Sequence, residues 1–71
     1  MERQKDQDVE YGKEVFLVRH IFWTEPHPKA FQAVWNAPEV WKYLNEYGST
    51  REEAIEKMKK AIDNYFQHAK N

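Results

Sequence analysis

The sequence predicts a small α+β domain, in which an antiparallel sheet of two or three strands packs on one C-terminal amphipathic helix. Three observations predict this fold. Residues 13–23 are rich in β-branched and aromatic side chains and lack Gly and Pro, a second such run covers 30–35, and apolar residues recur with the helical period over 51–68. A chain of 71 residues is expected to form one domain, 9–71, after a polar, disordered tail, 1–8.

The first two runs are predicted to be strands of a hairpin. Residues 13–23 combine Val, Ile, Phe and Trp, which fit the pleated, half-buried surface of a sheet. Pro26 and Pro28 follow, and they end any ladder because proline has no backbone N–H to donate. The connection to 30–35 is short, and a short connection favours antiparallel neighbours.

The segment 37–47 fits two different elements. As a strand, it places Trp41 and Tyr43 on one face together with the later odd-numbered residues. As a helix, it would begin at a cap on Asn36 and end at Gly48. We favour the strand because of the Trp and Tyr content. The helix is the alternative, and it would change the fold to a β-hairpin plus two helices.

Residues 51–68 are predicted to form the amphipathic helix. Thr50 and Glu53 have the spacing of a capping box, in which the hydroxyl and the carboxylate each accept a hydrogen bond from a backbone amide. The apolar side chains collect in a stripe roughly 140° wide, which is expected to face the sheet. This stripe consists of Ala54, Ile55, Met58, Ala61, Ile62, Tyr65, Phe66 and Ala69.

Composition excludes several classes of protein. The chain has no Cys, which excludes a disulfide framework and zinc sites built on thiolates. The chain has eleven Lys and Arg and twelve Asp and Glu, so it lacks the basic excess that a dedicated nucleic-acid-binding domain usually carries. No apolar run is long enough to span a membrane, and the polar N-terminus does not have the pattern of a secretory signal. A cytoplasmic location is therefore expected.

Neither a metal site nor a catalytic site is expected. His20, His27 and His68 lack the spacing of known zinc motifs. Ser49 and Thr50 are explained by the turn and the helix cap rather than as nucleophiles beside a base. With only two glycines, the chain offers no Gly-rich loop to hold phosphates. We therefore predict a non-enzymatic protein without a cofactor.

The excess of aromatic side chains, eleven against ten Val, Ile and Leu, needs an explanation. Apolar residues occupy both faces of the strand predicted over 13–23, and one helix covers only one face of a small sheet. The uncovered face would be an exposed apolar patch of the kind that marks interfaces. The other interpretation is that the rings complete a small core. The predicted partner-binding residues are Phe16, His20, Phe22, Phe31, Trp35, Trp41 and Tyr43.

Residues 47–55, Tyr-Gly-Ser-Thr-Arg-Glu-Glu-Ala-Ile, followed by Met58, Ala61 and Ile62, resemble the strand-to-helix step of the HicB-like antitoxins. The resemblance covers 14–66 as a pattern. It implies a β-β-β-α module similar to a truncated double-stranded-RNA-binding fold, and a protein that neutralises a small RNA-cleaving toxin, often as a homo-oligomer. The family's Pro-Gly-Cys-like segment before this turn is absent, and no catalytic residue is implied.

Together these features predict a non-catalytic protein-binding module. It would be an inhibitor or antitoxin-like regulator of a phage or mobile element that acts by occlusion through its aromatic sheet face. The expected partner is another protein or a second copy of the chain, as in a homodimer, and not a membrane. The alternative is a small nucleic-acid-binding module that stacks bases on the same face.

Overall fold

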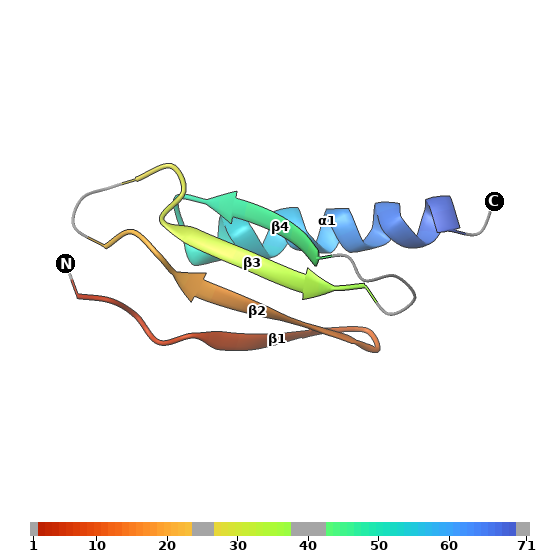
Figure 1. Cartoon of the computed structure of the whole chain (residues 1–71), viewed down its shortest axis with the longest axis horizontal. Coiled ribbons are helices and arrows are strands. Elements are labelled where there is room, and N and C mark those ends of the chain that lie inside the picture. Colours follow the sequence, from red (N-terminus) through yellow and green to blue (C-terminus); the bar gives the residue numbers. More distant parts are fainter. Residues whose placement is uncertain (1, 24–26, 38–42, 70–71) are drawn as a thin grey trace.

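The computed structural model describes residues 2–23, 27–37 and 43–69, and the side chains of all of these but Ala69. Within these residues the chain forms a sheet of four strands and one helix (Figure 1). The elements are β1 (Gln7–Tyr11), β2 (Glu14–His20), β3 (Phe31–Asn36), β4 (Tyr43–Gly48) and α1 (Arg51–Ala69). All neighbouring strands are antiparallel and follow one another in chain order.

The α+β class and the single C-terminal helix are confirmed, but the sheet has four strands rather than two or three. The additional strand, β1, begins at Gln7, inside the segment 1–8 that was predicted to be a disordered tail. Its polar residues become ordered because β2 supplies partners for their backbone groups. A two-residue loop joins the two strands, and Gly12, with φ of 63°, takes the position that a type II′ hairpin turn reserves for glycine.

The other strands follow the sequence closely. β2 and β3 form the predicted antiparallel hairpin, with His20 opposite Phe31 and Leu17 opposite Val34. β4 confirms the strand interpretation for the end of the ambiguous segment. The rest of that segment, 38–42, lies outside the described residues.

The core lies between α1 and one face of the sheet. The helix packs mainly against β4 and β3 and less against β2, as Figure 1 shows. Trp35 is 1% exposed, and the rings of Tyr65 and Phe66 meet it edge-on at 5.2 and 5.8 Å between ring centroids. The buried apolar residues are Phe16, Val18, Ala30, Phe31, Ala33, Trp35, Ala37, Ala54, Met58 and Ile62.

The start of α1 has the predicted caps, with one shift. The Glu53 amide donates to Thr50 Oγ1 at 3.1 Å, as a capping box requires. The Glu53 carboxylate, however, accepts from the amide of Ser49 at 2.8 Å, one residue earlier than the usual partner.

No helix among the described residues has the length and apolar character needed to cross a membrane.

Candidate functional site

Four of the seven predicted partner-binding residues lie in the core. Phe16, His20, Phe31 and Trp35 are each 6% exposed or less, because α1 covers the face of the sheet on which they lie. Their burial favours the interpretation of these rings as core over their interpretation as partner anchors.

The other two predicted residues that the structure describes, Phe22 and Tyr43, do not form one surface. Phe22 is 45% exposed just beyond β2, and Tyr43 is 64% exposed at the start of β4 on the opposite face of the sheet. Trp41 lies outside the described residues. The structure therefore separates Phe22 from Tyr43, and a surface for a partner has to be sought on the face that α1 leaves uncovered.

That uncovered face, here called the open face, has an apolar centre. Leu17 and Val34 lie opposite each other on the two inner strands, both half-buried, and Val15 beside them is 52% exposed. Tyr43 and Tyr47 extend this centre along β4. Alternation along the strands and their register define the open face as Asp8, Glu10, Val15, Leu17, Arg19, Gln32, Val34, Asn36, Tyr43, Asn45 and Tyr47.

The charged side chains beside the apolar centre differ between its two sides, acidic at β1 and basic near β4. Asp8 and Glu10 lie on β1, opposite Leu17 and Val15. On the other side, the Lys29 ammonium lies 5.3 Å from the centroid of the Tyr47 ring. Gln32 donates to Asn45 Oδ1 at 3.0 Å and to the Tyr47 hydroxyl at 3.4 Å, which holds this side of the face in one arrangement.

An uncovered face was predicted, but most of the residues named for it lie on the covered side, because β2 has mostly apolar residues on both faces. The signal lies in β3, where Gln32 and Asn36 alternate with Phe31, Ala33 and Trp35. Polar residues at every second position mark the solvent side of a strand. Since opposite residues share a face, the polarity of β3 also assigns the faces of β2.

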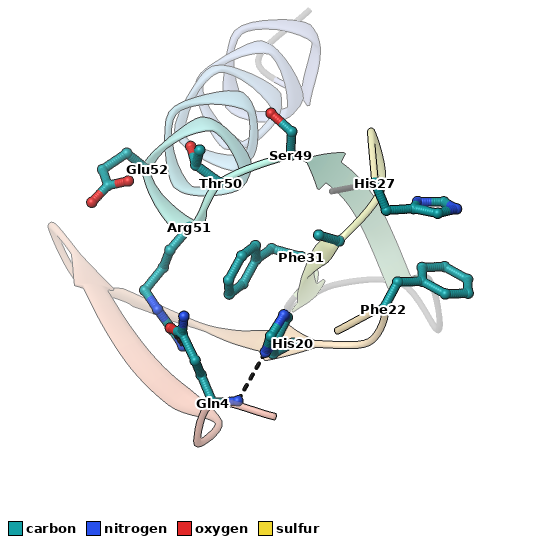
Figure 2. A pocket seen from close by; sticks show the side chains of 10 residues that line it. Gln4, His20, Phe22, His27, Phe31, Ser49, Thr50, Arg51 and Glu52 are labelled. Atoms are coloured by element: carbon teal, nitrogen blue, oxygen red, sulfur yellow. Dashed lines mark hydrogen bonds between the residues drawn. The ribbon is translucent and has the colours of Figure 1, made fainter. Parts of the chain in front are cut away.

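A second concave feature lies at the start of α1. It is a cleft of about 300 Å³ between the first turn of the helix, the end of β2 and the chain around His27, shown in Figure 2. Phe22 and His27 stack at 4.2 Å between ring centroids to form one of its walls. The residues that line the cleft are Gln4, His20, Phe22, His27, Ala30, Phe31, Ser49, Thr50, Arg51 and Glu52.

Within the described residues, no group of three or more His, Cys, Asp or Glu side chains comes together as a metal ion would require. At the far end of the molecule, the Tyr11 hydroxyl donates to both carboxylate oxygens of Asp63, at 2.9 and 2.8 Å. This hydrogen bond raises the pKa of the Tyr11 phenol, because the phenolate has no proton to donate and would face a carboxylate of the same charge.

Comparison with family models, with curated proteins and with solved structures gives no match for this chain. The resemblance to the HicB-like antitoxins therefore stays a prediction.

Proposed function

We propose that this domain is a non-catalytic protein-binding module that acts through the open face of its sheet, with a second copy of the chain as the occupant. The supporting observation is the apolar centre of Val15, Leu17 and Val34, which no described segment of the chain covers. Burying such surface is the main source of free energy in protein association.

The uneven charges of the open face favour a second copy. A two-fold axis parallel to the strands, lying between two copies packed face to face, places β1 of one copy over β4 of the other. The acidic side of each face, with Asp8 and Glu10, then meets the side of the other that carries Lys29. This complementarity acts twice in one dimer, once at each side.

The size of the open face limits the strength of the association. From the usual strand spacing and rise per residue, the face measures roughly 15–20 Å across the strands and about 17 Å along them. The area enclosed by these dimensions is smaller than the roughly 800 Å² of surface that each partner buries in a standard interface. We therefore expect weak dimers, with a dissociation constant on the order of 10–500 µM.

Sedimentation equilibrium at protein concentrations up to about 1 mM tests this proposal. We expect the average mass to rise with concentration toward that of a dimer. Val34→Lys places a charge in the apolar centre and should keep the chain monomeric. Gln67→Lys adds the same charge on the exposed surface of α1 and should leave the association unchanged.

A monomer at all concentrations would overturn the proposed occupant, as would equal effects of the two substitutions. Tyr43→Lys, at a position that is 64% exposed, serves if Val34→Lys unfolds the chain, which circular dichroism would show. We also propose that the module acts as an inhibitor or antitoxin-like regulator by occlusion, and that it is located in the cytoplasm.

The nucleic-acid alternative has less support. Phe16, Phe31 and Trp35 were predicted to stack bases, but they are buried under α1. The open face retains two tyrosines, and it carries Asp8 and Glu10, which repel phosphates. Salt-sensitive quenching of tryptophan fluorescence by single-stranded RNA would favour this alternative over protein binding.

A further inference from the structure

The cleft at the start of α1 contains a buried polar atom without a partner. His20 is 1% exposed, and its Nδ1 accepts a hydrogen bond from the backbone amide of Gln4 at 2.8 Å. Because Nδ1 accepts, the neutral ring carries its proton on Nε2. Within the described residues, this Nε2–H is buried and has no acceptor.

An unpaired buried donor is costly, and natural structures rarely leave one without a reason. Figure 2 shows that Nδ1 faces Gln4, while the other ring nitrogen points away from Gln4, toward the space that the lining residues enclose. The ring is held in this orientation, because it stacks on Phe31 at 4.4 Å between ring centroids and 8° between planes. His20 therefore presents a fixed donor to the cleft.

The start of α1 supplies further donors to the same cleft. The first amides of a helix have no acceptor within the helix and carry its positive partial charge. Side chains cap the amides of Ser49 and Glu53, but the caps do not use those of Arg51 and Glu52, two residues that line the cleft. The helix thus offers two amides beside the imidazole.

The charged side chains around the cleft are arranged to admit an anion. The Arg51 guanidinium lies 5.1 Å from the Phe31 ring centroid, and it donates to Gln4, Lys5 and Gln7, which keep it in the wall of the cleft. The Glu52 carboxylate points away from His20 and Phe31 in Figure 2. The volume of about 300 Å³ is some ten times the share of one water in the liquid, about 30 Å³.

We propose that this cleft binds a small oxyanion, a phosphate or carboxylate group, whose oxygens accept hydrogen bonds from His20 Nε2 and from the amides of Arg51 and Glu52. The guanidinium of Arg51 and the positive end of α1 contribute the attraction. Because Glu52 and Glu53 lie in the same turn, the affinity is modest, and we expect a dissociation constant of about 1 mM.

Nuclear magnetic resonance of the ¹⁵N-labelled full chain tests the proposal with inorganic phosphate and with acetate as probes. We expect saturable shifts at the Arg51 and Glu52 amides and at His20 Nε2, beyond those caused by chloride at the same ionic strength. The probe that binds more tightly identifies the class of oxyanion. Shifts that chloride reproduces, or a bound water on His20 with no response to either probe, would overturn it.

Two variants locate the site. His20→Asn keeps an acceptor for the Gln4 amide, but its side chain is too short for its NH2 group to reach the position of Nε2, and it should weaken binding at least fivefold. Arg51→Gln should also weaken binding, whereas His68→Asn, in the last turn of α1, should leave it unchanged. If His20→Asn fails to fold, the wild-type titration and Arg51→Gln decide. Unchanged affinity in Arg51→Gln would contradict the proposed contribution of the guanidinium.

Discussion

Gly48 is the residue at which the strand-to-helix step depends on the absence of a side chain. It is buried at the end of β4, and a Cβ there would lie 2.6 Å from the backbone nitrogen of Ala54 and 2.8 Å from the Cβ of Glu53. Neither atom moves freely, because Ala54 begins the hydrogen bonding of α1 and Glu53 is held by both caps. In the helix interpretation of 37–47, Gly48 would end that helix, whereas in the structure it permits a close approach between β4 and α1.

Gly48→Ala is therefore expected to lower the free energy of unfolding by about 1–3 kcal/mol, the usual cost of forcing extra atoms into a packed site. Gln67→Ala is the control. Gln67 is exposed on α1 and Ala is a good helix former, so little change is expected. Urea unfolding followed by circular dichroism measures both. Equal stability of the two variants would contradict the steric argument.

The strand β3 determines which face of the sheet is core. Its core residues Phe31, Ala33 and Trp35 alternate with a second set that is polar at Gln32 and Asn36, whereas β2 has mostly apolar residues on both faces. Trp35 is the largest fully buried side chain, and its indole donates to Glu14 Oε1 at 3.3 Å. An aromatic residue in a strand is thus a core residue or a surface residue according to its partner strands, and not according to its type.

Trp35→Ala is expected to cost about 3–5 kcal/mol of unfolding free energy, because it leaves a cavity against Tyr65 and Phe66. A domain of this size has a total stability of roughly 4–11 kcal/mol, so much of the chain should unfold. Tyr43→Ala, on the open face, should stay within about 0.5 kcal/mol of the wild type. Thermal unfolding compares them. A stable Trp35→Ala that loses only self-association would restore Trp35 as a partner anchor.

At the scale of the whole molecule, the described residues form one helix for a sheet with two faces. The helix lies closest to the β4 edge of the sheet, and the Tyr11–Asp63 contact joins β1, at the other edge, to the last turns of α1 across 52 residues of sequence. In this way α1 contacts both edges of the sheet, although it packs mainly on β4 and β3. The open face is what remains, and it is the reason for proposing a partner.

The Tyr11–Asp63 contact has a consequence for pH. The folded chain holds the phenol proton to higher pH than the unfolded chain, where the pKa is about 10. The contact therefore stabilises the fold below this value, and its contribution is lost as the pH rises through the raised pKa of Tyr11. Ultraviolet titration should show one tyrosine that ionises late. Asp63→Asn should bring it back toward 10, and Tyr11→Phe should remove it.

If Asp63→Asn leaves the late phase unchanged, the late tyrosine is not Tyr11 or its partner is not Asp63. Tyr43, which is 64% exposed on the open face, serves as the control. Tyr43→Phe should leave the late phase intact.

The sequence by itself determined the elements whose cause is local. The period of the apolar residues in α1, the cap on Thr50 and the hairpin of β2 and β3 all follow from neighbours within a few residues. β1 was missed because its residues are mostly polar and gain their order from pairing with β2. A strand of this kind has little local signal, apart from the Gly12 turn that follows it.

Only the tertiary structure decided which side of the sheet α1 covers, and hence which aromatic residues are core and which surface is open. Both faces of β2 are apolar, so its own pattern cannot choose between them. The choice depends on register across strands and on the close approach at Gly48, which sets where α1 leaves the sheet. The same long-range packing buries His20 beside the start of α1, since the residues that form the cleft are brought together only by the fold.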